Sequence, residues 1–507
     1  MISGHRPVNQ DTFNDDENLG KRIVLNDSDV FLYSAEAKIL DHLDDVMTMI
    51  VYHRDNLAKA YRVKRDYYKG RHRRIINATD KKLGKPDNRI IINYPKKLIN
   101  TFNGFFSGDP VQVSYQENGE PNDAINEKIQ DFLKNNDYDD VFSEASKYAD
   151  IYGRSYLYCY TDKDSKLHMA ACDPINMFMV YDDTIEQQPI AGVRYAYRGS
   201  QLTGTIITAN GDYKFTDDGK GEALTLTNTD EDGVTQNAHP FPRVPTIEFE
   251  ENDERLGLLD DIANLIDSVD QTMSEKMNDV DYFGDAYLAI IGVKLTDKQK
   301  QEVAETKLFN LYQEDDNDST TIPQVEFLNK ISNDDTQEHY LDRAIDMLYQ
   351  ISQVVNLSDS QFGMSADSAS GVALINKYQA MQAMAKTKSR KMSKMLRALF
   401  AILFDVENIA NADVTNLSFS FQQSVPHNDS EEATTYGTLF GKVPDELALS
   451  YLSKVDDPKK VAEKMKEDGD DGDQQTANMV ERPDKVGETD DKSANRADAN
   501  KATVTSG

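Results

Sequence analysis

The fold is decided by the stretch DERLGLLDDIANLIDSVDQTMSEKMNDV, residues 253–280. Its large apolar residues recur at spacings of three and four, which is the pattern of an amphipathic helix with one packed face. They are Leu259, Ile262, Ile266, Val269, Met273, Met277 and Val280. At 1.5 Å per residue, this stretch predicts a helix about 40 Å long. The preceding half of the chain reads as short helices, short strands and turns, so we expect an α+β fold that is mainly helical.

One line of acidic residues runs along this predicted helix. Because its members are separated by multiples of seven, they stay on one slowly drifting face. They are Asp253, Asp260, Asp267 and Asp281. A second amphipathic helix is predicted over residues 336–355, and its acidic side includes Asp342 and Asp346. Each acidic face is either a functional surface or a solvated outer face.

The charge balance limits what the chain can bind. Its 507 residues include 88 acidic and 56 basic ones, a formal net charge of -32 at pH 7. Tight binding of phosphates needs clustered Lys and Arg, so a broad nucleic-acid-gripping surface is not expected. No apolar run approaches the ~20 residues of a membrane span, and no membrane partner is expected. The only cysteines, Cys159 and Cys172, offer no disulfide framework or multi-cysteine metal site.

The sequence contains no catalytic motif with the expected spacing. A phosphate-binding loop, a zinc-binding His-Glu-x-x-His helix and a nucleophile elbow are all missing from it. Residues 315–326 keep several calcium-loop positions, but Thr320 replaces the glycine that the sharp turn needs. We therefore expect no enzyme activity, no cofactor and no metal site.

Two further segments have a distinctive composition. The run YYKGRHRR, residues 67–74, could contact nucleic acid or could be a solvated helix end, and we favour the helix end because cations suit the negative end of the helix dipole. The run NLSDSQFGMSADSASG, residues 356–371, is polar and rich in Gly and Ser. A loop this long between helices is typically functional or disordered.

The order of these elements resembles the portal family of tailed double-stranded-DNA phages, in particular of siphophages of Gram-positive hosts. Five segments carry the resemblance over about residues 35–465. They are YYKGRH (67–72), NYPKKLINTFNGFFSGDPV (93–111), FPRVPTIEFEENDE (241–254), FGMSADSASGVALINKY (362–378) and FSFQQSVPHNDSEEA (419–433). The two ends of the chain match nothing in the family.

The resemblance implies the phage portal architecture of wing, stem, clip and crown, assembled into a cyclic ring with a central channel. The expected division follows the chain. It comprises a flexible N-terminal arm (1–30), the wing (31–254, discontinuous with 372–428), stem helix 1 (255–284), the clip (285–332), stem helix 2 (333–355), the tunnel loop (356–371), a long wing helix and return strand (372–428), the crown (429–468) and a disordered acidic tail (469–507).

The resemblance also implies a function. The ring, most often a dodecamer, would be assembled in the host cytoplasm and would stand at the capsid portal vertex of the virion, where double-stranded DNA is packaged and ejected. Ring symmetry turns an acidic helix face into stacked rings of charge, which repel DNA phosphates within ~10 Å at 0.1 M salt. The expected channel-lining stem acids are Asp260, Asp267, Asp281, Asp342 and Asp346. Weak, sequence-independent DNA contacts are expected from the tunnel-loop residues Asp359, Ser360, Gln361, Phe362, Gly363, Met364 and Ser365.

The family's partners complete the expectation. They are further copies of the chain, transiently bound double-stranded DNA, the terminase large subunit, the head-tail adaptor, and the major capsid and scaffolding proteins. The clip would dock the packaging ATPase and the adaptor, with Lys294, Lys298 and Lys300 as candidate contacts. The basic residues of the predicted long helix, Lys386 to Arg397, are expected to pack against acidic neighbouring subunits rather than to bind DNA.

Two other classes of protein remain open from the sequence. An acidic scaffold or DNA mimic would be equally negative, but it would not need two stem-like helices that bracket a small module and a long Gly/Ser loop. A metal-dependent nuclease would need carboxylates that converge on a magnesium ion.

Overall fold

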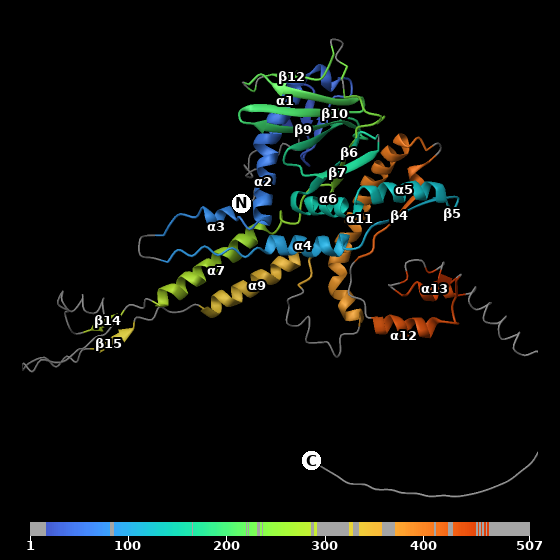
Figure 1. The fold of residues 1–507 in the computed structure, drawn as a ribbon. Helices are drawn as coiled ribbons and strands as arrows, with labels where there is room; N and C mark the ends of the chain where they lie inside the picture. Colours follow the sequence, from blue (N-terminus) through green and yellow to red (C-terminus); the bar gives the residue numbers. More distant parts are fainter. Residues whose placement is uncertain are drawn as a thin grey trace, which may run out of the picture. The chain divides into compact units, whose positions relative to one another are not determined.

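The computed structural model describes most of the chain and forms two compact units, Met1–Val425 and Pro426–Gly507. The described residues are 17–81, 86–164, 166–219, 221, 223–230, 234–235, 237–284, 288–291, 324–327, 334–356, 371–409, 412–423, 429–452, 455, 458, 461–462 and 464–465. Helices and several sheets are mixed in the first unit, and helices predominate in number of residues (Figure 1). The predicted α+β, mainly helical class is confirmed.

The largest sheet of the described residues has eight strands in the order β1-β2-β3-β8-β9-β10-β11-β12. Neighbours pair antiparallel except β3 and β8, which are parallel. The strands are β1 (Glu17–Asn18), β2 (Ile23–Leu25), β3 (Phe31–Tyr33), β8 (Met177–Asp182), β9 (Pro189–Arg198), β10 (Gln201–Thr208), β11 (Gly211–Asp217) and β12 (Leu224–Leu226). The chain before residue 30 thus contributes strands, and Ile23 and Leu25 are buried. The prediction of a flexible N-terminal arm over residues 1–30 is therefore wrong for residues 17–30, which include strands β1 and β2.

Two three-stranded sheets and a set of helices complete the first half. The sheets have the orders β13-β6-β7 and β16-β4-β5. Their strands are β4 (Gln112–Glu117), β5 (Glu120–Pro121), β6 (Arg154–Thr161), β7 (Leu167–Cys172), β13 (Thr246–Glu250) and β16 (Leu417–Ser420). The helical elements are η1 (Ile39–Asp41), α1 (Leu43–Tyr52), the π-helical turn η2 (His53–Leu57), α2 (Ala58–Tyr68), α3 (Arg73–Ile76), α4 (Tyr94–Ser107), α5 (Asp123–Asn135) and α6 (Tyr138–Tyr152).

Helix α4 shows how local sequence sets these elements. The Asn93 side chain accepts a hydrogen bond from the Lys96 backbone N–H, and Pro95 occupies the first turn, where its missing N–H costs nothing. Leu98, Phe102 and Phe105 then recur on one face and are buried. The apolar face places α4 against α6 in the core of the first unit.

Long helices dominate the second half of the first unit. They are α7 (Ala263–Gly284), α9 (Asp334–Ser352) and α11 (Gly371–Val406), with a short antiparallel pair of strands, β14 (Leu288–Ile291) and β15 (Gln324–Phe327), and the single turn η3 (Val414–Asn416). Helices α7 and α9 pack side by side (Figure 1). In the second unit, α12 (Asp429–Leu439) and α13 (Asp445–Leu449) are described.

Helix α7 begins ten residues later than the amphipathic pattern predicts, because residues 253–262 pack tightly against the end of α6. Gly153 has a φ of +92°, and a Cβ there would lie 1.8 Å from the carbonyl oxygen of Arg255. A Cβ on Gly257 would lie 2.8 Å from the carbonyl oxygens of Asp150 and Ile151. Tertiary packing at two glycines thus replaces the first predicted turns of helix with a tight bend.

Candidate functional site

Helix α7 carries a polar stripe that binds an extended segment of its own chain. We define the α7 polar stripe as Asp267, Asp270, Ser274, Asn278 and Asp281. Its side chains accept hydrogen bonds from alternate backbone N–H groups: Ile92 to Asp270 (2.8 Å), Ile90 to Ser274 (2.9 Å) and Asn88 to Asn278 (2.6 Å). Four helical residues rise about 6.0 Å and two extended residues about 6.6 Å, so the two repeats match.

The same stripe holds the end of α2 and the start of α3. The His72 Nδ1 bonds the Asp270 carboxylate, and its Nε2 lies 3.2 Å from the Tyr67 carbonyl oxygen. The Tyr67 ring stacks on His72 with centroids 4.7 Å apart, and its hydroxyl donates to Asp267 at 2.6 Å. Both His72 nitrogens face acceptors, and both Asp267 and Asp270 are fully buried. Burial, followed by the Asp267 carboxylate, raises the pKa of Tyr67 well above its usual range.

The acidic line predicted on α7 therefore faces inward over much of its length. Lys64 Nζ lies 2.6 Å from the Asp260 carboxylate, and both side chains are buried. Asp260 and Asp267 are thus paired inside the fold and do not face solvent in this chain. Asp281 is exposed and accepts a hydrogen bond from the Asn88 side chain at 2.5 Å. Of the three acids predicted for the first stem helix, Asp260 and Asp267 have buried side chains and Asp281 is exposed, and a role in lining a channel stays a prediction.

Helix α9 has a wide apolar side and an acidic face. Leu341, Ala344 and Leu348 are buried on the face that packs toward α7. Asp342 and Asp346 are exposed on a second face. Beside the buried residues, the apolar side continues with large side chains that are 41–44% exposed, and we call them the α9 apolar stripe: Tyr340, Met347 and Ile351. The Tyr340 hydroxyl lies 2.6 Å from Ser268 Oγ of α7, so Met347 and Ile351 are the members that point away from that contact. Counting 3.6 residues per turn, this stripe lies roughly 140° around the helix from the acidic face.

Several predicted site residues lie outside the described residues. They are the tunnel-loop residues Asp359, Ser360, Gln361, Phe362, Gly363, Met364 and Ser365, and the clip lysines Lys294, Lys298 and Lys300. Their roles stay predictions.

Each of the two basic segments that could have contacted DNA has residues bound to carboxylates of the same chain. In the run at residues 67–74, Arg73 donates to Asp66 at 2.6 Å, and Tyr67 and His72 are buried rather than solvated. On α11, Lys388 and Lys391 pair with Asp150 and Glu250, respectively. Intramolecular pairing, rather than the expected packing against neighbouring subunits, accounts for these two lysines.

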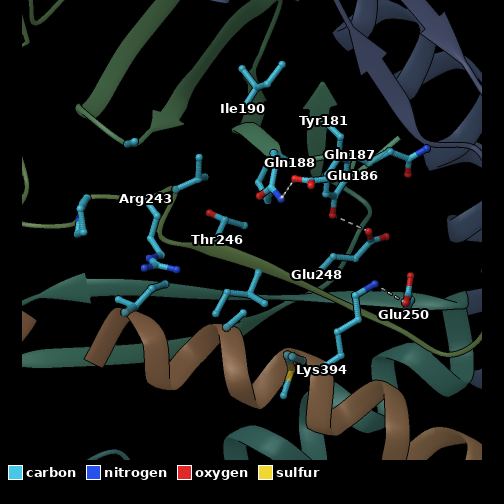
Figure 2. Close-up of a pocket in the computed structure, with 18 of the residues that line it drawn as sticks. Tyr181, Glu186, Gln187, Gln188, Ile190, Arg243, Thr246, Glu248, Glu250 and Lys394 are labelled. Atoms are coloured by element: carbon cyan, nitrogen blue, oxygen red, sulfur yellow. Dashed lines mark hydrogen bonds and ion pairs between the residues drawn. The ribbon is translucent and has the colours of Figure 1, made fainter. Parts of the chain in front are cut away.

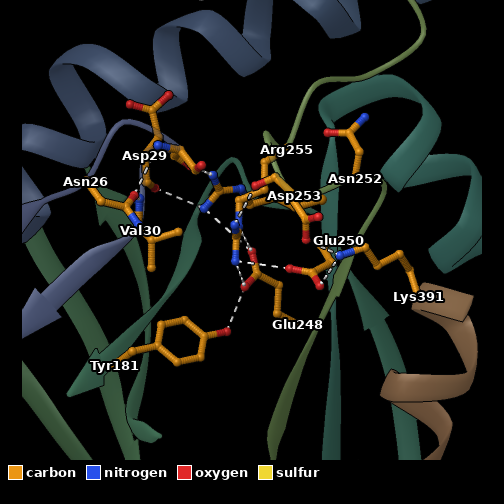
Figure 3. A network of polar contacts seen from close by, with 12 residues as sticks. Asn26, Asp29, Val30, Tyr181, Glu248, Glu250, Asn252, Asp253, Arg255 and Lys391 are labelled. Atoms are coloured by element: carbon orange, nitrogen blue, oxygen red, sulfur yellow. Dashed lines mark hydrogen bonds and ion pairs between the residues drawn. The ribbon is translucent and has the colours of Figure 1, made fainter. Parts of the chain in front are cut away.

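A buried network joins β6, β13 and α11 (Figure 3). The Glu248 carboxylate lies 3.0 Å from Arg255 Nε and 3.6 Å from an Arg154 nitrogen, and it accepts from the Tyr181 hydroxyl at 2.7 Å. Glu250 receives Lys391 at 2.9 Å. Although burial raises the pKa of Glu248, the charges of Arg255 and Arg154 outweigh it and lower that pKa to about 2. The network therefore stabilises the ionised carboxylate.

A cavity of about 550 Å³ lies beside this network, between the turn at residues 186–190, the segment 242–250 and α11 (Figure 2). Its lining is mixed, with Ile190, Val244 and Ile402 beside charged groups. Of the three carboxylates that line it, Glu248 and Glu250 are paired with cations, and Glu186 accepts a hydrogen bond from the Gln188 side chain at 3.3 Å. The pairing of Glu248 and Glu250 does not fit the convergent metal-binding carboxylates of a metal-dependent nuclease.

One group among the described residues has the spacing for a metal ion: His42, Asp44 and Asp45, whose ligand atoms lie within 4.8 Å of one another. Asp45 already accepts hydrogen bonds from Arg22 at 2.5 Å and from the Tyr33 hydroxyl at 3.0 Å. These bonds account for the placement of Asp45 without a cation.

The family is decided by comparison with known proteins. A family model described as "Phage portal protein, SPP1 Gp6-like" matches residues 48–475. The chain belongs to this phage portal family. The portal protein of Bacillus phage SPP1 is 24% identical over 427 residues, which cover 80% of this chain and 80% of that protein. This portal chain is accordingly a structural, non-enzymatic component of the phage virion, and the resemblance drawn from the sequence is confirmed.

Two solved structures are also similar to this portal chain. A chain in the neck of an empty gene transfer agent particle has a TM-score of 0.41 at 10% identity, and the match covers 70% of this chain and 88% of that chain. A chain in the virion of a native gene transfer agent particle has a TM-score of 0.42 at 10% identity, with coverage of 71% and 90%. Among the described helices of this portal chain, none is both long and apolar enough to cross a bilayer.

Proposed function

We propose that copies of this portal chain close into a ring, most often of twelve, and that double-stranded DNA is packaged and ejected through its central channel. The observation that carries the proposal is the width of the apolar side of α9. A helix that only covered its own core would bury its apolar side there. The α9 apolar stripe extends that side beyond the contact with α7 and leaves Met347 and Ile351 exposed, which fits a neighbouring copy in a ring.

This arrangement also orients the acidic residues. With one side of α9 on α7 and the apolar stripe on the next subunit, Asp342 and Asp346 are left on the open side. We infer that these two residues, with Asp281, face the channel. Ring symmetry repeats them in every subunit, and the resulting charge rings repel DNA phosphates within ~10 Å at 0.1 M salt. DNA would slide past such a wall without binding to it.

Membership of the portal family supports our assignment of the other parts of the chain. In this proposal residues 31–254 with 372–428 form the wing, and α7 and α9 form the stem. Residues 285–332 form the clip, where the terminase large subunit and then the head-tail adaptor dock, and residues 356–371 form the tunnel loop. Residues 429–468 form the crown and 469–507 an acidic tail. The capsid and scaffolding proteins would surround the ring at the portal vertex.

A charge placed on the apolar stripe tests the proposed contact between subunits. Met347→Asp removes the apolar contact and places a carboxylate in it, and burial of one such side chain is worth about 1.5–3 kcal/mol. That loss corresponds to roughly 10-fold to 100-fold weaker association at each contact. We expect rings of the wild type, and monomers of the variant, in sedimentation at equal concentration.

Gln350→Asp is the matched control, because Gln350 is an exposed residue of α9 outside the apolar stripe. It adds the same charge to the same helix and should leave the rings intact. If Met347→Asp assembles as well as Gln350→Asp, the α9 apolar stripe is not the contact between subunits.

A further inference from the structure

A buried lysine joins the middle of α11 to α6. Lys388 is 1% exposed, and its Nζ contacts the Asp150 carboxylate, the Ser146 carbonyl oxygen at 3.2 Å and Glu251 Oε2 at 3.0 Å. Three aromatic rings surround the ammonium group, with centroids 5.1–5.9 Å away: Phe102, Phe106 and Phe249. We call Asp150, Lys388 and Glu251 the α11 cluster.

The charges of the α11 cluster do not balance if both carboxylates are ionised. One ammonium group then faces two carboxylates in an apolar cage, and a buried unpaired charge is costly. Among the described residues, the buried Asp150 Oδ2, Glu251 Oε2 and Ser146 hydroxyl make no hydrogen bond of acceptable geometry, although Lys388 Nζ lies 3.0 Å from Glu251 Oε2. Burial raises the pKa of Asp150 well above its usual range. The positive charge of Lys388 lowers that pKa, and the negative charge of Glu251 raises it further. A proton on Asp150 would make the cluster neutral.

Charged groups on the neighbouring elements do not supply the missing cation. Helix α4 presents only the rings of Phe102 and Phe106. Lys64 of α2 is paired with Asp260 at 2.6 Å. On α11, Lys391 and Lys394 both lie 2.9 Å from Glu250, and Lys391 also contacts Asp253. Arg154 and Arg255 are likewise paired with Glu248. Since these cations of the described residues are all paired elsewhere, a proton taken up from solvent fits the missing charge.

We propose that the α11 cluster binds one proton on Asp150 and acts as a proton-controlled latch that holds α11 against α6. With the proton bound, Lys388 and Glu251 form a neutral pair, and Asp150 is an uncharged carboxylic acid. When the proton leaves to solvent, the cluster carries a net charge of -1 in its aromatic cage, and the packing of α11 loosens. The latch is a property of the single chain, so it stands independently of ring formation.

The position of the α11 cluster in the middle of α11 lets it affect the packing of the preceding half of the helix. Lys388 lies about 26 Å along α11 from Gly371, at 1.5 Å per residue. Tyr378, between these two positions, is buried and stacks on Phe105 of α4 with centroids 5.8 Å apart. Loosening at Lys388 would therefore affect the whole half of α11 that leads back toward Gly371.

Hydrogen exchange on the full-length chain tests the latch. The measurement compares amide protection of residues 381–395 at about pH 6 and about pH 9, after correction for the intrinsic rate of exchange. Release of a single proton changes an opening constant by at most about tenfold per pH unit. We expect protection in the wild type to fall by about tenfold or more over this range, and Asp150→Asn to show no such fall. Asp253→Asn is the control, because Asp253 is exposed and its loss should leave the pH dependence unchanged.

Equal pH dependence in wild type and Asp150→Asn, or constant protection in the wild type, would overturn the proposal. If Asp150→Asn does not fold, infrared difference spectra of the wild type supply a second test. They should contain the carbonyl stretch of a protonated carboxyl group at about pH 6. Glu251→Gln removes the repelling carboxylate, so that band should disappear at lower pH than in the wild type. An unchanged midpoint, or no such band, would also overturn the latch.

Discussion

Replacing Asp270 by alanine should be one of the most damaging single changes in the chain. Asp270 is fully buried and accepts from both the Ile92 backbone N–H, at 2.8 Å, and His72 Nδ1. Its loss leaves a buried amide and a buried imidazole without their acceptor. An orphaned buried donor costs about 1–3 kcal/mol, and this substitution leaves two of them, each of which had bonded a carboxylate. Because the two losses overlap, we expect a decrease of about 3–5 kcal/mol in the free energy of unfolding.

Urea denaturation followed by far-ultraviolet circular dichroism measures this decrease, since the chain has no tryptophan for a fluorescence signal. Asp270→Asn keeps one acceptor and should lose less than Asp270→Ala. Gln271→Ala is the matched control, because Gln271 is an exposed neighbour on the same helix and such changes typically stay within ±0.5 kcal/mol. If the free energy of unfolding of Asp270→Ala lies within about 1 kcal/mol of the wild-type value, the α7 polar stripe does not hold the segment at residues 88–92 as described.

Two further changes test other parts of the fold. Gly153→Ala should lower the free energy of unfolding by at least about 2 kcal/mol in urea denaturation, because it adds strain at positive φ to a clash with the Arg255 carbonyl oxygen. Gly119→Ala is the control: Gly119 has a φ of +87° and open space around it, so this variant should lose only about 1–2 kcal/mol in the same assay. The pKa of Glu248 is lowered from 4.5 to about 2, so its contribution to stability is complete above about pH 4.5 and disappears as the pH falls through about 2. Glu248→Gln should therefore flatten the acid limb of the stability profile, and an unchanged limb would show that Arg154 and Arg255 do not depend on this charge.

The helices of the second half could be predicted from the sequence because their apolar residues repeat at spacings of three and four. Strands β2 and β3 could not be predicted with the same signal. Each has three residues, IVL and FLY, and a strand this short shows no alternation until it pairs with a neighbour. The start of α7 was missed for a different reason: the bend at residues 253–262 is set by contacts with α6, which lie far away in sequence.

The acidic residues at spacings of seven show that a sequence pattern can place residues on one face without showing whether that face is exposed. Asp267 and Asp281 lie on one face of α7, as the spacing of seven predicts, but Asp260 lies in the bend before the helix. The pattern could not show that Lys64 and Tyr67 would cover Asp260 and Asp267. A signal was present, since Ser274 and Asn278 continue the same line with short uncharged groups that suit internal hydrogen bonds.

The mass and symmetry of the purified full-length chain test the central claim most directly. Native mass spectrometry with electron-microscope images at micromolar concentration would give both. The proposal predicts closed rings of about a dozen copies around an open centre, with α9 of each subunit against its neighbour. A chain that stays monomeric or dimeric, including in the presence of its scaffolding protein, would contradict it.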